Sequence, residues 1–446
     1  MSASTDFEFA VIGGGVSGLL AAFLLSNQGK SVALIEPQSP GGLIQSRSEA
    51  GFTRELGAAT LAENSDFRQV LQQLGLTDQV VYPAVKNFER YVWHDGRAEP
   101  LPTGPFALLR SRLFTPGEKW RAVRGVFAKL PADLRAKHNL SVLELFSGLF
   151  SPQIARKTVD PALRGIFGGN ISALSASALF PELVQVLRDG GSLIAYLKQK
   201  KRSSGGASRQ IFCLRGGNQV LTRALFEALS SKATIFPQLA IAILARSPGF
   251  QISLANGQEV TSRHCLISTS GQTTAPFIKP LSSELSQLLA GLRHAPIAVL
   301  HFAVERKYSL PKNGFGVLFP SNGDYRILGV LFNSLLFPHV APPDQQLITV
   351  CLGGIGDEEV MSLSDQDLVA LARGEIRSAL RIEDAKSLGI KRWEKAIPQY
   401  EVSHEKITAV MRTLESAYPG LIFLGADQGG VGVPARISKV VQSLSA

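Results

Sequence analysis

The pattern of apolar and polar positions near the start of the chain predicts a strand, a helix and a second strand. An uninterrupted apolar run at residues 9–12 is typical of a strand buried on both faces. Apolar positions continue at helical spacing over residues 19–25, and a second apolar run covers residues 31–35. Because a helix between two such strands normally returns the chain to a parallel sheet, we expect a βαβ unit here.

Similar patterns predict elements along the rest of the chain. We expect helices at residues 65–74 (ended by Gly75), 218–229 and 365–380, and a largely helical region from 104 to about 200. We expect strands at residues 90–102 (two strands around a turn at Asp95-Gly96), 211–217 (a strand and a turn), 250–254, 260–267, 295–304, 327–332, 347–352 and 421–425. Residues 51–57 are typical of a hairpin, residues 198–209 of a charged Gly/Ser-rich loop, and the residues after Val431 of a last helix. The strand at 421–425 is expected to return to the first sheet.

The turn between the first predicted strand and helix contains three spaced glycines, Gly13, Gly15 and Gly18. Gly13 permits a tight turn, Gly15 lets backbone amides approach a pyrophosphate, and Gly18 lets the helix lie close to the strand. The helix N-terminus attracts phosphate, and Glu36 at the end of the second strand can accept hydrogen bonds from a ribose hydroxyl. The sequence therefore predicts a dinucleotide site, the alternative being a Gly-rich turn without a ligand.

The residues after Glu36 indicate which dinucleotide this site would bind. They read PQSPGGL at 37–43, with a Gly41-Gly42 pair shortly after the acidic residue. Such a pair is typical of FAD-binding oxidoreductases related to amine oxidases and is unusual in nicotinamide dehydrogenases. We therefore expect FAD and not NAD.

Composition bounds the class of protein. The chain has 446 residues, of which 45% are hydrophobic and 18% charged, a balance typical of a globular protein with two or three domains. Its three cysteines are far apart, which fits a reducing, cytoplasmic compartment, and its scattered histidines indicate no metal site. We see no signal-peptide pattern and no apolar run of the roughly 18–20 residues that a membrane-spanning helix needs.

The net charge of +10 is concentrated between residues 104 and 138, which we call the basic stretch. This stretch holds eight Lys or Arg residues against two acidic ones, with aromatic and aliphatic residues between them. Basic residues mixed with aromatics are found at nucleic-acid sites and at anionic membrane surfaces. No nucleic-acid motif accompanies them, so we expect either a solvated helix face or peripheral association with the inner face of a membrane.

With these elements in view, the chain resembles the protoporphyrinogen oxidase family, flavoenzymes of haem synthesis that include a coproporphyrinogen-oxidising branch. The resemblance runs nearly end to end. It rests on GGGVSGL at 13–19, GIFGGNISALS at 165–175, FPEL at 180–183, GSL at 191–193, LRGGNQVL at 214–221, APIAV at 295–299, GFGVLFP at 314–320, LGVLFNS at 328–334, WEKAIPQY at 393–400 with His404, and GGVGV at 429–433.

The resemblance implies an α/β fold with three parts. The first is a discontinuous FAD-binding, Rossmann-like domain of the amine-oxidase superfamily type, formed by residues 1–80, 211–290 and 400–446. The second is a mixed-sheet substrate domain at residues 81–103 and 291–399. The third is a helical, membrane-facing insertion at residues 104–210.

The resemblance also implies the residues that contact FAD. By position these are Gly13, Gly14, Gly15, Val16, Ser17, Gly18, Glu36, Gly42, Leu43, Gly57, Ala58, Ala59, Thr60, Leu239 near the adenine, Trp393 near the isoalloxazine, and Val431, Gly432 and Val433 at its pyrimidine end. Pro40, Ala58, Ser403 and Ala426 depart from the family's usual residues close to this site.

Four further positions match residues that meet the tetrapyrrole in this family. Arg90 corresponds to an arginine that binds a propionate, a role that suits the guanidinium fork, although a surface arginine on a hairpin is the alternative. Leu318, Leu331 and Cys351 correspond to positions that enclose the ring, and Cys351 is expected to act as a small buried apolar residue. For His404 a helix-start or packing role is favoured over acid–base chemistry.

The function implied is oxidation of protoporphyrinogen IX to protoporphyrin IX, with FAD as the electron sink and molecular oxygen as the acceptor. No catalytic side chain is assigned, because the flavin supplies the chemistry. Oxidation of coproporphyrinogen III is one alternative, and a related flavoenzyme such as a carotenoid desaturase or an amine oxidase is another. A non-catalytic scaffold that binds flavin and porphyrin is an alternative of a different class, and a homodimer is a candidate assembly.

Overall fold

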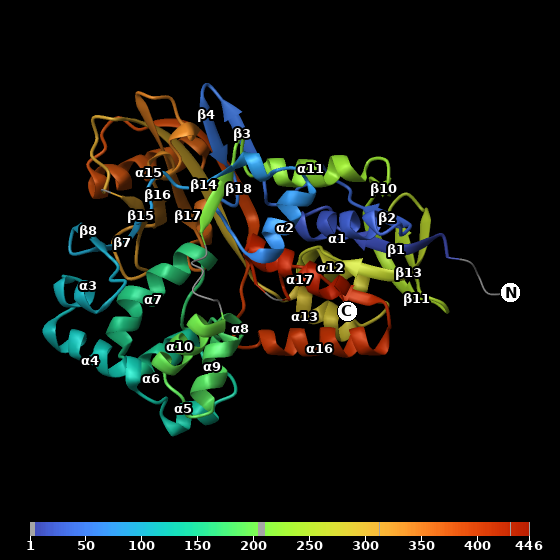
Figure 1. Ribbon diagram of the computed structural model, residues 1–446, viewed down its shortest axis with the longest axis horizontal. Helices are drawn as coiled ribbons and strands as arrows, with labels where there is room; N and C mark the ends of the chain where they lie inside the picture. The colour runs from blue at the N-terminus through green and yellow to red at the C-terminus, as the bar shows by residue number, and fades with distance from the viewer. Residues whose placement is uncertain (1–4, 204–209, 312, 429, 446) are drawn as a thin grey trace.

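The computed structural model describes residues 5–203, 210–311, 313–428 and 430–445. Two large sheets and a group of helices make up most of the molecule (Figure 1). The first sheet lies toward the N-terminus in the figure, the second lies at the opposite end, and helices α3 to α10 gather beside the second sheet.

The first sheet is the one that the opening βαβ pattern predicted. Its order is β10-β2-β1-β13-β12-β11, with β19 also paired to β13. Its strands are β1 (Phe7–Ile12), β2 (Val32–Ile35), β10 (Thr234–Phe236), β11 (Ala240–Ala245), β12 (Phe250–Leu254), β13 (Glu259–Ile267) and β19 (Leu421–Phe423). Five of them run parallel, so loops after β1, β2, β13 and β19 leave from one edge. Strands β11 and β12 extend the sheet as antiparallel neighbours.

Helices cover both faces of this sheet and share a core with each. One face packs against α1 (Val16–Asn27), α2 (Ser65–Gln73), α11 (Gln219–Leu229) and α17 (Val433–Ser445). The other packs against α12 (Gly271–Ile278), α13 (Ser283–Ala290) and α16 (His404–Ala417). The first helix begins at Val16 and not at residue 19, because Gly15 is its N-cap. Helix α16 was not among the helices expected from periodicity, although a helix start was one of the two roles favoured for His404. His404 begins α16, with its ring stacked on Tyr400.

The second sheet has the order β18-β14-β17-β16-β15-β7-β8. Its strands are β7 (Glu89–His94), β8 (Arg97–Pro100), β14 (His294–Glu305), β15 (Gly314–Leu318), β16 (Ile327–Leu331), β17 (Gln345–Gly353) and β18 (Lys386–Pro398). One face shares a core with α15 (Asp365–Leu380). The strands expected at 90–102, 295–304, 327–332 and 347–352 are confirmed, whereas β15 and β18 were not predicted.

The helical region expected from residue 104 is confirmed. It contains α3 (Pro105–Arg110), α4 (Pro116–Phe127), α5 (Ala132–Ala136), α6 (Val142–Leu149), α7 (Pro152–Phe167), α8 (Ala176–Leu179), α9 (Pro181–Arg188) and α10 (Leu193–Ser203). The predicted loop at 198–209 is wrong over its first half, because α10 continues to Ser203, and residues 204–209 lie outside the described residues. Among the residues that the structure describes, no helix combines the length and apolarity needed to cross a bilayer.

Short elements connect the two sheets. Strands β3 (Ser46–Glu49) and β4 (Phe52–Glu55) form a hairpin whose turn at Ala50-Gly51 has positive φ angles, so the hairpin starts earlier than the predicted residues 51–57. The remaining elements are β5 (Leu61–Ala62), β6 (Val80–Val81), β9 (Ile211–Leu214), α14 (Asn333–Leu336) and the 3₁₀ turns Thr77–Gln79, Pro338–Val340 and Glu358–Ser362.

Candidate functional site

The Gly-rich turn after β1 adopts the geometry that its glycines predicted. Gly13 has a φ of +108°, which a residue with a side chain rarely adopts. A Cβ at Gly18 would overlap the carbonyl oxygen of Gly13, so only glycine lets α1 lie this close to the strand. The backbone N–H of Gly14 donates to Glu36 Oε2 at 2.5 Å. The turn and the end of β2 are therefore fixed to each other by the chain itself.

Space for a phosphate lies at the N-terminus of α1. A Cβ at Gly15 would meet no protein atom within 4 Å, although the turn around it is packed. Gly41 and Gly42, both at positive φ, bring a second turn against it, with Gly41 N–H donating to Gly14 O at 2.8 Å. This gap beside a helix N-terminus fits the pyrophosphate of a dinucleotide. Val16 and Ser17 form the first turn of that helix.

The end of β2 and the end of β10 meet at the same edge of the sheet. Glu36 N–H donates to Phe236 O at 3.0 Å, and Glu36 Oε1 accepts from Gln38 N–H at 2.8 Å. Leu239 follows β10 by three residues, and its side chain is 46% exposed. An exposed apolar side chain beside the predicted ribose contact suits an adenine ring.

Two loops that the resemblance assigned to FAD lie against each other. A Cβ at Gly57 would overlap the carbonyl oxygen of Leu43, so the two backbones touch. Ala58 O accepts from the buried Asn218 Nδ2 at 2.8 Å, and Ala59 and Thr60 follow as partly exposed residues. The loop after β2 and the segment at 57–60 are thus brought together, although they belong to different elements.

The third group of predicted FAD contacts lies at the start of α17. Val433 is the first residue of this helix, and Gly432 O accepts the N–H of Arg436 at 3.1 Å. Val431 packs beside the core around Tyr400. Because β19 pairs with β13, and β13 with β1, this helix start reaches the same sheet edge as the Gly-rich turn. Gly429, part of the same motif, lies outside the described residues.

Strand register in the second sheet puts the predicted substrate residues and Trp393 on one face. Leu318 on β15 pairs with Gly329 on β16, and Gly329 pairs in turn with Cys351 on β17. Leu331, two residues after Gly329, pairs with Gly316 on β15. Arg90 is opposite Gly316 on the other side, and Trp393 is opposite Ile297, two residues before the partner of Cys351. Because directly paired residues and those two positions apart share a face, Arg90, Leu318, Leu331, Cys351 and Trp393 point the same way.

Helix α7 closes over part of this face. A Cβ at Gly165 would overlap Leu318 Cδ2, so the first glycine of the GIFGGN motif allows this close approach. Arg164 Nη1 donates to Phe319 O at 3.1 Å and ties the helix to the end of β15. Burial raises the pKa of the Cys351 thiol to about 11, so the side chain stays a neutral thiol. Leu318, Leu331, Cys351 and Trp393 are partly buried on this face, so α7 shields only part of it from water.

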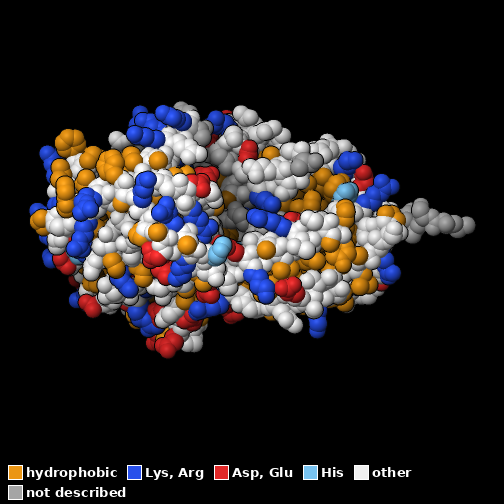
Figure 2. All heavy atoms as spheres, turned by 90° about the horizontal axis from the view of Figure 1, so that it is seen from below, with side chains coloured by type: hydrophobic (Ala, Val, Ile, Leu, Met, Phe, Trp, Pro, Cys, Tyr) orange, Lys and Arg blue, Asp and Glu red, His pale blue; other side chains and the backbone are white. Residues whose placement is uncertain are grey.

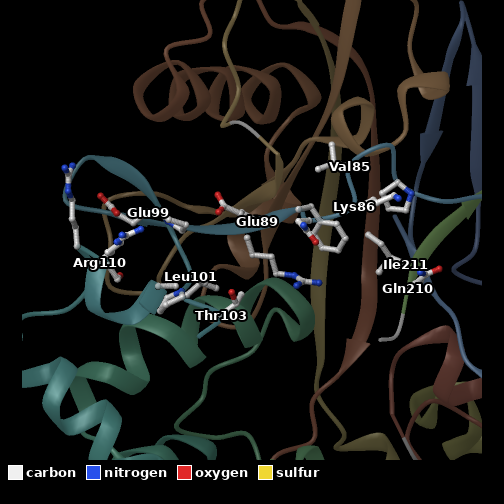
Figure 3. Close-up of a pocket in the computed structure, with 18 of the residues that line it drawn as sticks. Val85, Lys86, Glu89, Glu99, Leu101, Thr103, Arg110, Gln210 and Ile211 are labelled. Carbon is white, nitrogen blue, oxygen red and sulfur yellow. The ribbon is translucent and has the colours of Figure 1, made fainter. Parts of the chain in front are cut away.

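Arg90 also lines a large open cavity of about 1170 Å³, which we call the Arg90 cavity. Figure 3 shows this cavity, with Glu89 and Arg110 among its labelled lining residues. The Arg90 guanidinium lies 5.2 Å from the ring centre of Phe88 and 5.1 Å from that of Phe315. Of the four predicted substrate residues, only Arg90 lines this cavity. Its other charged lining residues are Lys86, Glu89, Glu99, Arg110 and Arg112.

Three consecutive residues at the end of β4 contact the second sheet, and we call these contacts the β4 seam. Arg54 Nη1 donates to Leu388 O, His301 Nε2 lies 3.0 Å from Glu55 O, and Trp393 Nε1 donates to Leu56 O at 2.6 Å. Arg54, Glu55 and His301 are all buried. Arg54, Glu55 and His301 were not predicted as site residues from the sequence. Nothing local in the sequence marks them, because their partners across the seam lie more than two hundred residues away.

Glu55 is an unusual group in this region. Its two carboxylate oxygens accept from Asn218 N–H at 2.8 Å and from Ser46 Oγ at 2.7 Å. Burial is the main cause that raises the pKa of Glu55 to about 7, and these two hydrogen bonds oppose it.

Comparison with known proteins decides the family. The sequence profile of flavin-containing amine oxidoreductases matches residues 16–434. The chain belongs to this family. It is therefore a flavin-dependent oxidoreductase, and the predicted cofactor, FAD, is confirmed. The predicted FAD-binding α/β fold of the amine-oxidase superfamily is confirmed as well.

Relatives of known name include enzymes for two different porphyrinogens. The chain is 26% identical to protoporphyrinogen oxidase 2, chloroplastic/mitochondrial, of Arabidopsis thaliana, over 96% of this chain and 91% of that protein. It is 27% identical to coproporphyrinogen III oxidase of Bacillus subtilis (strain 168), over 96% of this chain and 95% of that protein. A solved structure of a putative protoporphyrinogen oxidase from Exiguobacterium sp. 255-15 has a TM-score of 0.81 at 20% identity, covering 99% of this chain and 98% of that one, which shows the shared fold.

Proposed function

We propose that this flavoenzyme oxidises a porphyrinogen to the corresponding porphyrin, with protoporphyrinogen IX as the first candidate substrate and molecular oxygen as the acceptor. The observation that carries the proposal is the shared sheet face of Arg90, Leu318, Leu331, Cys351 and Trp393. The apolar side chains of this face, with Arg90 at its edge and Lys391 over the ring of Trp393, suit a flat ring that carries carboxylates at its rim.

The roles of the side chains follow from this placement. Leu318, Leu331 and Cys351 would contact the ring, α7 would exclude water, and Arg90 would bind a propionate through charge-assisted hydrogen bonds. FAD, when bound, supplies the acceptor for electrons from the weak C–H bonds of the bridging carbons, and we assign no side chain as general base. Oxygen would take up the six electrons and six protons that leave the substrate, as three molecules of hydrogen peroxide.

The FAD contacts remain those that the resemblance implied. We propose that the phosphates lie over Gly13 to Gly18 and Gly42, the ribose at Glu36, the adenine beside Leu239, and the isoalloxazine among Leu43, Gly57, Ala58, Ala59, Thr60, Trp393, Val431, Gly432 and Val433. The gap at Gly15 and the meeting of Leu43 with Gly57 support this arrangement. The first sheet and its helices would form the FAD domain, and the second sheet the substrate domain.

Anaerobic mixing with each candidate substrate tests the proposed function. Protoporphyrinogen IX should bleach the flavin absorbance at a rate that saturates with substrate concentration, whereas an amine and a carotene should leave it oxidised. Bleaching by the amine or the carotene alone would assign the chain to another activity of its family. Tight porphyrin binding without any bleaching would indicate a scaffold.

Coproporphyrinogen III is the second candidate, and one observation favours it. Lys86, Arg110 and Arg112 line the Arg90 cavity together with Arg90, and none of the four forms an ion pair within the described residues. The two glutamates of the lining already have partners, since Tyr91 donates to Glu89 at 2.6 Å and Arg97 pairs with Glu99 at 2.7 Å. Four carboxylates of coproporphyrinogen could use these cations, whereas protoporphyrinogen has only two.

The basic stretch carries a further part of the proposal, peripheral contact with the inner face of an anionic membrane. Figure 2 shows apolar and basic side chains together at the end of the molecule that α3 and α4 occupy. The large exposed apolar side chains there are Phe106 (80% exposed), Leu109, Trp120, Val123 and Phe127. Exposed aromatic side chains beside Arg and Lys suit insertion among lipid headgroups.

A further inference from the structure

The β4 seam joins the segment proposed to hold the flavin to the sheet proposed to hold the substrate. Two of its three hydrogen bonds come from aromatic rings on neighbouring strands, His301 on β14 and Trp393 on β18. They end on adjacent backbone carbonyls, Glu55 O and Leu56 O, directly before Gly57. The position of residues 57–60 relative to the sheet face therefore depends on these rings.

His301 has one defined role in the seam. Glu55 O can only accept a hydrogen bond, so Nε2 of His301 must carry the hydrogen and Nδ1 must be bare. Nδ1 is buried and has no hydrogen-bond partner among the described residues. Burial lowers the pKa of His301 to about 4, with the charge of Arg54 as a minor cause, so the ring is neutral near pH 7.

Arg54 reinforces the same contact from the flavin side. His301 pairs with Gly389 across β14 and β18, and a Cβ at Gly389 would lie 2.6 Å from Arg54 Nη1. The glycine thus leaves room for the guanidinium to reach Leu388 O. Two rings from the sheet therefore reach residues 55 and 56, and Arg54 of the same segment donates back to the sheet.

We propose that His301 is a positioning residue that sets the distance between the flavin ring and the substrate face, through its hydrogen bond to Glu55 O. This inference rests on the proposed function, because it takes residues 57–60 and Trp393 as flavin contacts and the sheet face as the substrate site. The loss of the hydrogen bond would loosen residues 55–60, which Trp393 and Asn218 would still hold, and would misalign the two reactants. Small misplacements of reacting groups can cost on the order of a hundredfold in rate.

Three substitutions of His301 separate this role from packing. His301→Gln places an amide near the Nε2 position, His301→Asn places one near Nδ1, and His301→Leu has similar volume without a donor. The readouts are the dissociation constant for FAD, kcat and KM for porphyrinogen, and the melting temperature. His264→Leu, on β13 of the first sheet, is the matched control and should leave kcat and FAD affinity unchanged.

The expected result is that the Gln variant stays close to wild type. The Leu and Asn variants should bind FAD about tenfold more weakly and lose at least tenfold in kcat, with KM within about twofold of wild type. Equal FAD affinity and kcat in all three variants would overturn the proposal, and so would a Gln variant as defective as Asn. If the Leu variant fails to fold, the Gln and Asn pair decides alone. If wild-type flavin is reduced by neither porphyrinogen, the proposed function fails, whereas the FAD affinities still test His301.

Discussion

Arg90 lies over the adjoining rings of Phe88 and Phe315 and forms no ion pair within the described residues, so its charge is available to a ligand. We expect Arg90→Ala to raise KM for the porphyrinogen by ten- to a hundredfold, since a hydrogen bond to a charged group is worth about 1.5–3 kcal/mol. Steady-state porphyrin fluorescence measures this. The flavin content and melting temperature should change little, because the proposed FAD contacts lie elsewhere.

The control for Arg90 is Arg47→Ala, an exposed arginine on β3 that should leave KM at the wild-type value. An unchanged KM and kcat in Arg90→Ala would show that Arg90 is only a surface residue of its hairpin. A loss of kcat with no change in KM would argue for orientation of the ring and against affinity.

Glu55 gives a prediction about stability and pH. Its pKa of about 7 in the folded protein lies above the ordinary value of 4.5, so its contribution to stability is full below pH 4.5 and is lost as the pH rises through 7. Relative to wild type, Glu55→Gln should gain about 2–3 kcal/mol in free energy of unfolding between pH 5 and pH 8. Denaturant unfolding of both proteins at the two pH values measures the difference. A difference that does not vary with pH would mean that Glu55 titrates normally.

At the scale of residues, the sequence was informative where the requirement is local. Gly13 is required by the turn after β1, and Gly18 by the close approach of α1 to that turn. Glu36, at the end of β2, accepts a hydrogen bond from the same turn, and these elements follow each other directly in the sequence. The residues of the β4 seam could not be found in this way. Arg54 and His301 are buried only because strands distant in the sequence come together, and a lone histidine in an apolar run gives no sign of its partner.

At the scale of elements, two glycines at the start of α1 have different roles: Gly18 allows close packing, and Gly15 leaves space for a ligand. Gly18→Val should destabilise the fold by about 1–3 kcal/mol or more, because its side chain would overlap Gly13 O. Gly15→Val should keep the fold but lose bound FAD, because its side chain enters the gap proposed for the pyrophosphate. The flavin-to-protein ratio and the melting temperature of the flavin-free proteins measure the two effects. Full flavin occupancy in Gly15→Val would remove the phosphate assignment.

The absence of β18 from the predicted strands has a physical reason. β18 is an edge strand, paired with β14, and it carries three lysines, one arginine and one glutamate, which an edge tolerates. It therefore lacks the apolar run that marks the inner strands. The sequence does contain a signal for helix α16. Its buried residues Ile407, Met411 and Leu414 recur at helical spacing, so periodicity alone could have predicted this helix.

At the scale of the whole molecule, the exposed side chains of α3 and α4 predict binding to anionic vesicles. Trp120→Ser with Phe127→Ser should weaken co-sedimentation, and Arg121→Gln with Arg124→Gln should weaken it about tenfold or more, at roughly 1 kcal/mol per basic residue. The matched control is Ile241→Ser with Leu244→Ser, which removes exposed apolar side chains on β11. Equal binding to neutral and anionic vesicles would refute the electrostatic part, and no binding at all would refute the membrane proposal.

The fold of the molecule was predictable in its first sheet and less so in its second. Consecutive apolar runs and spaced glycines in the sequence predict the first sheet. The second sheet depends on pairings such as β14 with β18, which join separate stretches of sequence. The substrate face emerges only from that register. The positions of Arg90, Leu318, Leu331 and Cys351 in the sequence gave no indication that they share one face, and only the resemblance grouped them.

The pairing of β1 with β13 has a consequence for biosynthesis. Asp6 and Thr261, which hydrogen bond beside this pairing, are 255 positions apart. A ribosome adds about 5–20 residues per second, so β1 waits roughly 10 to 50 seconds for its neighbour. During that time one face of β1 lacks most of the core that covers it, because that core comes mainly from residue 260 onward, and chaperones are the natural protection for it. Nascent chains stalled before residue 259 should carry no flavin, which makes cofactor loading a late step and not a nucleus for folding.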